Sequence, residues 1–367
     1  MKKLKVIISG GGTGGHIFPA LAIANEIKQR YANADILFVG ANGRMEMEKV
    51  PQAGYQIKGL NIAGFQRGSL LKNISLPFKV LLSVLAARNI ISKFKPDVAV
   101  GVGGYASAPL LFAASLSGIP TVIQEQNSFA GVTNKILARW AKRICVAYDG
   151  MEKVFPSQKI IKTGNPVRAN IAAANYSKEK ALDFFGLEKN KAVVLVIGGS
   201  LGARTINQSI EATFEKIAEN NVQLLWQTGK TYYEDYKHLG NKNPNVKVLQ
   251  FIDNMDAAYS AADIIISRAG ALSISELQII GKPTILVPSP NVSEDHQTHN
   301  AMALVNNNAA IMIKDSEAKF NLIPTAIDLL KHDSATLRNQ LATNIRKMAI
   351  TNAAEKIVNE IISCIKQ

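Results

Sequence analysis

The stretch "VIISGGGTGGHIFPALAIA", residues 6–24, decides the fold of this chain. A β-branched apolar run ends at Ser9, five glycines follow, and apolar residues then recur at helical spacing. A strand that passes through a glycine-rich loop into a helix predicts an α/β fold with a parallel sheet. Gly10, Gly12 and Gly15 fit the pattern G-x-G-x-x-G, in which bare backbone approaches a ligand at a helix N-terminus. A tight turn would need one or two of these glycines, but not five.

Short apolar runs alternate with helical patterns along the rest of the chain. They include "ADILFVG", "PDVAVGVG" and "IPTVIQEQ" in the first half, and "AVVLVIGG", "VQLLWQTG" and "DIIISRAG" in the second. Each half opens with a strand, a glycine-rich loop and a helix, and 367 residues are more than one core usually serves. We therefore expect two Rossmann-like domains, residues 1–165 and 166–343, divided at "TGNPVR".

The composition is that of an ordinary globular protein, with 47% apolar and 19% charged residues. Its two cysteines, Cys145 and Cys364, form no short-spaced pair, so we expect a reducing compartment and no thiolate metal site. The opening "MKKLKVII" is too short for a secretory signal. The most apolar region, residues 80–91, is too short to span a membrane. These features predict a protein of the cytoplasmic compartment.

The net charge is +14, and residues 49–96 contain eight Lys and Arg but no Asp or Glu. The same region is rich in Leu, Val and Phe. It fits either a helix on an anionic lipid surface or a core helix with a solvated basic face. Nucleic-acid binding is not expected, because no aromatic stacking series or known module accompanies the charge.

Further glycine-rich loops follow other apolar runs, at residues 101–109, 197–205 and 267–276. In open α/β sheets such loops lie at the carboxyl ends of the strands, where ligands bind, so they predict a cleft lined from both domains. Helix N-termini there could hold a diphosphate without a metal. A dinucleotide site is disfavoured, because the second strand ends in "ANGR" with no carboxylate before Glu46. "TGKT" is no P-loop, because Leu224 stands where the first glycine is needed.

Individual side chains in these loops admit two interpretations each. A neutral His16 could take a proton from a substrate hydroxyl, or the ring could donate a hydrogen bond to a ligand or a carbonyl. Ser273 and Glu276 fit a capping box or a ribose-binding carboxylate. Asp295, His296 and His299 could suggest a metal site, but such a grouping more often supplies polar residues at a helix start.

With these residues in view, the chain closely resembles the MurG family, the glycosyltransferases that add N-acetylglucosamine to lipid I and give lipid II in bacterial peptidoglycan synthesis. The segments that carry the resemblance run in order along nearly the whole chain: "GGGTGGHIFPALAIA", "KPDVAVGVGGYAS", "QEQNSFAGVTNK", "GNPVR", "GGSLGARTIN", "FIDNM", "SRAGALSISE" and "DHQTHNA". Each segment alone is only suggestive, but the ordered series is highly specific.

The resemblance implies a GT-B fold, in which two Rossmann-like domains with parallel sheets face a cleft. A C-terminal helix, residues 344–367, would return to the first domain. The donor would be UDP-N-acetylglucosamine, held mainly by the second domain, with no cofactor or metal strictly required. The acceptor would be lipid I, at the cytoplasmic face of the inner membrane. The protein would be peripheral, with the region 49–96 on the anionic surface and contacts to other cell-wall synthesis proteins.

The resemblance also implies roles for single residues. His16 would be the base of an inverting displacement, with Tyr105 and Glu125 as neighbours. Arg168 and Ser200 would contact the diphosphate region, Ile252 the uracil, Glu276 the ribose and Gln297 the sugar. The remaining donor-site residues would be Thr13, Gly14, Gly15, Asn127, Arg268, Ala271, Leu272 and Ser273.

The sequence departs from the family at three of these segments. Gln124 stands where a histidine is common, so this position is a weak candidate for a base, and Ser273 and His296 replace Thr and Gln. Four other functions stay open at this point: transfer to another membrane lipid such as diacylglycerol, a nucleotide-sugar epimerase, a dehydrogenase, and a sugar-binding module without turnover.

Overall fold

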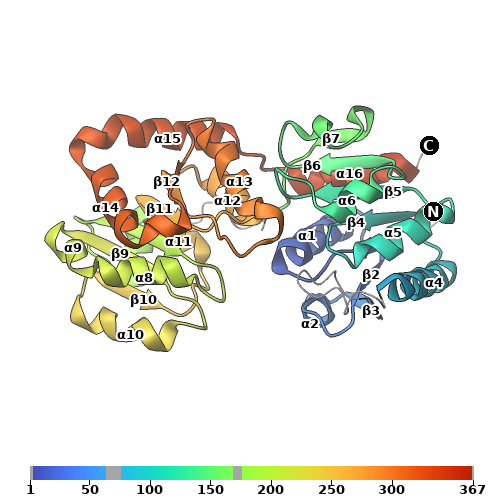
Figure 1. The fold of residues 1–367 in the computed structure, drawn as a ribbon, viewed down its shortest axis with the longest axis horizontal. Helices are drawn as coiled ribbons and strands as arrows, with labels where there is room; N and C mark the ends of the chain where they lie inside the picture. Colours follow the sequence, from blue (N-terminus) through green and yellow to red (C-terminus); the bar gives the residue numbers. More distant parts are fainter. Residues whose placement is uncertain (1–2, 63–75, 168–175, 366–367) are drawn as a thin grey trace. The chain divides into compact units, whose positions relative to one another are not determined.

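The computed structural model describes residues 3–62, 76–167 and 176–365. The chain divides into two compact units. Unit 1 comprises residues 1–167 and 352–367, and unit 2 comprises residues 168–351. Each has its own sheet and core (Figure 1).

Unit 1 is built on a seven-stranded sheet in which every pairing is parallel. Its strands are β1 Lys5–Ser9, β2 Asp35–Ala41, β3 Gln56–Leu60, β4 Val98–Gly101, β5 Thr121–Glu125, β6 Arg143–Val146 and β7 Ile160–Lys162. Their order is β3-β2-β1-β4-β5-β6-β7, so the strand order reverses between β1 and β4. The carboxyl ends of these two strands are where such a sheet binds ligands.

Helices cover both faces of this sheet. They are α1 Gly14–Arg30, α2 Glu46–Gln52, α4 Leu76–Phe94, α5 Ser107–Leu116, α6 Val132–Leu137 and α16 Ala353–Ile365. The period-2 alternation of each strand decides which layer a side chain meets. Val6 and Ile8 pack with α1 and α16, whereas Ile7 packs with α4, α5 and α6 on the other face. Short 3₁₀ turns at Met151–Lys153 and Ser157–Lys159 lead into β7.

Helix α16 belongs to unit 1 although it follows unit 2 in the chain. Its apolar stripe, Ile357, Val358 and Ile361, is fully buried in the core that α1 shares. The segment 344–367, which we expected to form one helix, is divided. Residues 344–347 end α15 in unit 2, and α16 begins at Ala353.

Unit 2 repeats this plan with six parallel strands. They are β8 Ala192–Ile197, β9 Val222–Gln227, β10 Val246–Leu249, β11 Ile264–Ser267, β12 Thr284–Leu286 and β13 Ile311–Met312. Their order, β10-β9-β8-β11-β12-β13, reverses between β8 and β11.

The helices of unit 2 again enclose the sheet. They are α7 Lys178–Phe185, α8 Arg204–Ala212, α9 Phe214–Glu219, α10 Tyr233–Lys242, α11 Met255–Ala261, α12 Ala271–Ile280, α13 His296–Val305, α14 Ala318–Leu330 and α15 Ala335–Lys347. Trp226 packs with α8, α9 and α14 on one face, while Leu195 and Ile265 are fully buried on the other. Two parallel sheets with the strand order of dinucleotide-binding folds confirm the predicted fold class.

Candidate functional site

In unit 1 two glycine-rich loops interlock at the carboxyl ends of β1 and β4. Gly104 has φ +79°, and a Cβ there would lie 2.4 Å from the carbonyl oxygen of Gly11. Any side chain at residue 104 would therefore force the two backbones apart. At this position the missing side chain serves the contact between the two loops.

A buried carboxylate holds the first loop in place. Glu46, at the start of α2, is fully buried and accepts hydrogen bonds from the backbone N–H groups of Gly12, at 2.9 Å, and Ala41, at 3.0 Å. A Cβ on Gly11 would lie 2.2 Å from one of its oxygens. In the sequence, Glu46 was notable only because it lies too far along the chain to serve a dinucleotide site. In the structure its carboxylate holds the glycine-rich loop in place by hydrogen bonds, and we call this side chain the clamp of the loop.

His16 lies in the first turn of α1, directly after this loop. Its Nδ1 atom is 3.0 Å from Oε1 of Gln126. A Cβ on Gly103 would lie 2.8 Å from the same nitrogen, so the imidazole packs against bare backbone. The Nδ1 side of the ring thus meets a side-chain amide and not a backbone carbonyl.

Glu125 is buried, and both of its carboxylate oxygens accept hydrogen bonds from nearby residues. Its two oxygens accept from the N–H and side chain of Asn127, from the N–H of Gly131 at 3.1 Å and from Asn134 at 2.8 Å. A carboxylate with four such bonds organises the loop after β5. Asn127, expected at the donor site, is positioned by it.

Tyr105 and Gln124 take different positions. The Tyr105 ring lies beside Gly12, and among the described residues its buried hydroxyl has no hydrogen-bond partner. Gln124 is fully buried and donates to Asn165 at 2.9 Å. Thr13, at the N-cap of α1, and Gly14 and Gly15, in its first turn, complete the group around His16.

Unit 2 contains a polar pocket of about 600 Å³ at the carboxyl ends of β8 and β11. The glycine-rich loop after β8 and the starts of α8 and α12 form its walls. The lining residues are Ile197, Gly198, Gly199, Gly202, Ala203, Arg204, Thr205, Tyr232, Ser267, Arg268, Gly270, Ser273, Ser289, Asn291, Gln297 and Asp315. The predicted residues Arg268, Ser273 and Gln297 therefore share one cavity.

Two polar side chains in this pocket are fixed by hydrogen bonds. Arg268 pairs with Asp315, which also accepts from the Thr205 hydroxyl at 2.8 Å. Oε1 of Gln297 accepts the N–H groups of Ala269, at 3.2 Å, and Ser289, at 2.8 Å. The NH₂ group of Gln297 is then the end that remains to donate to a ligand.

The loop after β8 also packs backbone to backbone. Gly202 has φ +91°, and a Cβ there would lie 2.1 Å from the carbonyl oxygen of Thr228. Gln227 donates to the carbonyl of Gly199 at 3.0 Å and accepts from the N–H of Ile252 at 2.9 Å. Ile252, the predicted uracil contact, is therefore tied to the glycine loop.

The start of α12 bears on one of the two interpretations of Ser273 and Glu276, the capping box. The N-cap residue is Gly270, so Ser273 lies inside the first turn and the capping-box interpretation is wrong. Glu276 is buried and accepts from the Tyr259 hydroxyl at 3.0 Å. Ala271 and Leu272 open the helix. Arg168 lies outside the described residues.

Two family models match the chain. Residues 6–146 match the glycosyltransferase family 28 N-terminal domain, and residues 193–361 match the glycosyltransferase family 28 C-terminal domain. The chain belongs to glycosyltransferase family 28.

Curated relatives in family 28 match the chain from end to end. The UDP-N-acetylglucosamine–N-acetylmuramyl-(pentapeptide) pyrophosphoryl-undecaprenol N-acetylglucosamine transferase of Parabacteroides distasonis is 56% identical and covers 100% of this chain and 99% of that protein. The enzyme of the same name from Flavobacterium psychrophilum is 53% identical, with the same coverage.

Solved structures agree with this assignment. The chain superposes on Acinetobacter baumannii MurG with a TM-score of 0.79 at 29% identity, covering 99% of this chain and 100% of that one. It also superposes on a UDP-GlcNAc 2-epimerase from Neisseria meningitidis with a TM-score of 0.66 at 16% identity, covering 99% and 100%. The latter likeness shows the fold alone.

Several residues of the family 28 site escaped the sequence analysis. They are Glu46 and Gln126 in unit 1, and Arg204, Thr205, Tyr232, Ser289, Asn291 and Asp315 in unit 2. Arg204 and Thr205 follow "GGSLGA" directly, so the motif itself could have suggested them. Of the described residues of unit 2 that were predicted at the donor site, five are not among those that line the pocket: Ser200, Ile252, Ala271, Leu272 and Glu276.

The histidine pair near α13 does not form a metal cluster. Asp295 has φ +50° and accepts from the Thr298 hydroxyl at 2.7 Å. Across residues 3–62, 76–167 and 176–365, no group of three or more His, Cys, Asp and Glu could hold a metal ion. The polar helix-start interpretation therefore fits Asp295, His296 and His299 better.

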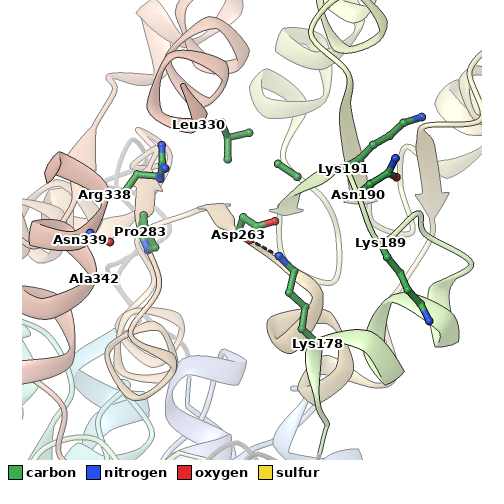
Figure 2. Close-up of a pocket in the computed structure, with 11 residues that line it drawn as sticks. Lys178, Lys189, Asn190, Lys191, Asp263, Pro283, Leu330, Arg338, Asn339 and Ala342 are labelled. Carbon is green, nitrogen blue, oxygen red and sulfur yellow. Dashed lines mark hydrogen bonds and ion pairs between the residues drawn. The ribbon is translucent and has the colours of Figure 1, made fainter. Parts of the chain in front are cut away.

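A second cavity of unit 2, of about 470 Å³, lies at the amino ends of β8, β11 and β12 (Figure 2). Its cations already have partners. Lys178 pairs with Asp263 at 2.5 Å, Lys191 with Glu188 at 2.6 Å, and Lys189 with Asp183 at 3.2 Å. These three lysines are paired with carboxylates, and the cavity lies at the opposite ends of the strands from the glycine-rich loop after β8.

Helix α4 carries large apolar side chains on its outer surface. Ser83, Ala87 and Ile91 face the core, whereas Phe78 is 73% and Leu82 is 65% exposed. Leu81 and Leu85 are also exposed, as are the cations Lys79 and Arg88. The outer face of α4 therefore combines large apolar side chains with cations, while its inner face packs in the core. No helix among the described residues is long and apolar enough to cross a membrane.

Proposed function

We propose that this family 28 protein transfers N-acetylglucosamine from UDP-N-acetylglucosamine to the 4-hydroxyl of N-acetylmuramic acid in lipid I, which gives lipid II for peptidoglycan synthesis. The observation that carries the proposal is 53–56% identity, over 98–100% of this chain, with relatives of that name. At this identity the loops of both units are included in the match. The exposed apolar face of α4 supports a lipid-linked acceptor.

The donor binds in the polar pocket of unit 2. Its volume of about 600 Å³ is within the range of small-molecule sites. The diphosphate lies at the loop containing Ser200 and at the N-terminus of α8, where Arg204 adds positive charge. Gln297 donates to the sugar, Glu276 takes the ribose hydroxyls, and the loop at Ile252 receives the uracil.

The reaction is a single displacement that inverts the anomeric carbon. The acceptor oxygen attacks this carbon, His16 takes the hydroxyl proton, and the bond to the diphosphate oxygen breaks as UDP leaves. Positive charge at the α8 N-terminus stabilises the leaving diphosphate. No metal ion is required for this charge balance.

The acceptor is reached from the membrane surface. Phe78, Leu81, Leu82 and Leu85 enter the interface of an anionic bilayer, and Lys79 and Arg88 contact its headgroups. The protein therefore works as a peripheral protein on the cytoplasmic face of the inner membrane.

The deciding experiment measures transfer of labelled N-acetylglucosamine from its UDP donor to a short-chain lipid I analogue. Diacylglycerol and a reaction without acceptor run in parallel. We expect product with the lipid I analogue alone. Product with diacylglycerol would favour the other lipid acceptor, and UDP release in all three reactions or in none would reject the proposal.

A second experiment tests the membrane surface. The double variant Phe78→Ser/Leu82→Ser should bind vesicles with anionic lipid at least tenfold more weakly than the wild-type protein, because the bound protein loses two apolar side chains that enter the bilayer interface. The control is Phe320→Ser, at a comparably exposed phenylalanine on α14. Equal vesicle binding by both variants would contradict the assignment of α4.

A further inference from the structure

A chain of buried amides extends from His16, and backbone carbonyls fix its direction. Nε2 of Gln126 donates to the carbonyl oxygens of Val102, at 2.9 Å, and Gln124, at 3.2 Å. Only the NH₂ group can satisfy two carbonyl acceptors. Oε1 of Gln126 is therefore the atom that faces Nδ1 of His16 at 3.0 Å.

The far end of the chain gives the same orientation independently. Nδ2 of Asn165 donates to the backbone carbonyl of Gln126 at 3.0 Å, so its Oδ1 must accept from Nε2 of Gln124 at 2.9 Å. Oε1 of Gln124 then faces Nε2 of Gln126, whose two hydrogens are shared among this oxygen and the carbonyl oxygens of Val102 and Gln124. The three amides are between 0% and 2% exposed, so water does not compete for these bonds.

This polarity determines where a neutral His16 carries its proton. Oε1 of Gln126 has no hydrogen, so the 3.0 Å contact is a hydrogen bond only if Nδ1 of His16 donates. The lone pair of the neutral ring is then on Nε2. Among the described residues no hydrogen-bond partner faces Nε2, whereas Nδ1 is enclosed by Gln126 and Gly103.

We propose that Gln126 is a positioning residue that holds neutral His16 as the Nδ1–H tautomer and so presents Nε2 as the proton acceptor. The proposal rests on the proposed function, in which His16 deprotonates the acceptor. Imidazole in water prefers the opposite, Nε2–H tautomer, whose lone pair would here point at Gln126. In the reaction the acceptor proton moves to Nε2, and the resulting imidazolium keeps its Nδ1–H bond to Gln126.

The direct test requires no substrate. Long-range ¹H–¹⁵N spectra of ¹⁵N-histidine-labelled protein report which ring nitrogen is protonated, and His16→Gln identifies the His16 signals among five histidines. We expect Nδ1 protonated and Nε2 unprotonated in the neutral ring. A neutral His16 protonated on Nε2 would overturn the proposal.

Two matched variants separate positioning from packing. Gln126→Met and Gln124→Met both break the amide chain with a side chain of similar length, but only Gln126 contacts His16. We expect kcat to fall roughly 10- to 100-fold in Gln126→Met, with KM for the donor within about threefold. In Gln124→Met, the Nδ1–H tautomer and most of kcat should persist, because Val102 still orients Gln126.

The outcomes distinguish this inference from the proposed function. The Nδ1–H tautomer without transfer to the lipid I analogue would reject the function and leave the tautomer assignment standing. Transfer with an Nε2–H ring would reject the role of Gln126 alone. Equal losses in both Met variants, with the tautomer unchanged in Gln126→Met, would reduce Gln126 to a packing role and overturn the proposal.

Discussion

The two glycine-rich loops look alike in sequence but are held by groups of different charge. In unit 1 the carboxylate of Glu46 takes the N–H of Gly12. In unit 2 the neutral side-chain amide of Gln227 donates a hydrogen bond to the carbonyl oxygen of Gly199. Glu46 accepts a hydrogen bond from a loop N–H and places a negative charge beneath the loop of unit 1. Gln227 donates to a loop carbonyl and adds no charge beneath the loop of unit 2.

This difference supports the proposal that the loop of unit 2, and not that of unit 1, receives the diphosphate. An anion is stabilised by N–H groups and by nearby positive charge, and a buried carboxylate repels it. The loop of unit 2 is followed by Arg204 and α8, while the loop of unit 1 lies over Glu46. A glycine pattern therefore identifies close backbone, and the group beneath it decides the charge of the ligand.

The largest effect is expected on removal of the anionic clamp. Glu46→Ala leaves two backbone N–H groups without their acceptor inside the core, which should lower the free energy of unfolding by about 3 kcal/mol. Denaturant unfolding measures this loss, and UDP affinity should stay within about twofold. Glu48→Ala, at an exposed position on the same helix, is the control. Loss of UDP binding in Glu46→Ala would break the contrast between the loops.

Bulk in the loop of unit 2 should act on the donor. In Gly202→Ala the new Cβ meets the Thr228 carbonyl, so the loop must shift and UDP affinity should fall by about 30-fold or more. Gly199→Ala is the control, because residue 199 has a similar positive φ but open space around the Cβ. The only expected cost of this change is backbone strain, which should lower the free energy of unfolding by about 1–2 kcal/mol. Calorimetric titration with UDP measures both variants. Equal affinities would show that the loop does not contact the nucleotide.

Exchanging the charge of the second clamp sharpens the same point. Gln227→Glu places a carboxylate beneath the unit 2 loop; it keeps an acceptor for the N–H of Ile252 and loses only the donor to Gly199. Gln227→Met loses both hydrogen bonds without adding charge. If charge decides, Gln227→Glu should still weaken UDP binding by about 1–2 kcal/mol more than Gln227→Met. The difference should shrink as salt rises. If the two variants bind UDP equally, the charge beneath the loop does not select the ligand.

Unit 2 also holds a largely enclosed lysine. Lys282 donates to the carbonyls of Ser260 and Ala262 at the end of α11, and burial lowers its pKa from 10.5 to about 8. Because the unfolded chain keeps this proton to higher pH, the penalty is fully present below pH 8 and decreases as pH rises toward 10.5. Wild-type stability should gain about 1–2 kcal/mol relative to Lys282→Met between pH 8 and about 9.5. Parallel curves for the two proteins in pH-dependent unfolding would contradict this.

The smallest effect should follow removal of divalent metal. In the proposed mechanism the α8 N-terminus and Arg204 supply the positive charge at the diphosphate, so excess EDTA should change transfer by less than about twofold. A tenfold loss that magnesium restores would mean that these groups do not suffice.

The sequence predicted the strands and the glycine loops because both leave a local pattern. It left the faces of α4 undecided, since Ser83, Ala87 and Ile91 recur at the same helical spacing as Phe78, Leu82 and Leu85. Only the packing on the sheet shows that the smaller set faces inward.

The clamps were beyond the sequence for another reason. The contact of Glu46 with Gly12 joins residues 34 positions apart, and the orientation of Gln126 depends on the carbonyl of Val102. The direction in which a backbone N–H or carbonyl points depends on the pleat and register of neighbouring strands. The identity of a single residue does not predict it. The capping-box pattern at Ser273 is wrong as a helix start, because the N-cap residue lies three positions earlier, at Gly270.

The position of α16 has a consequence for how the protein is made. Unit 2 is a continuous stretch, whereas unit 1 lacks the partner of α1 until the residues from Ala353 onward have left the ribosome. During synthesis the apolar groove that Ile357 and Ile361 fill is open to solvent while unit 2 can already be folded. Unit 1 therefore cannot complete its core until α16, the last described helix of the chain, has been made.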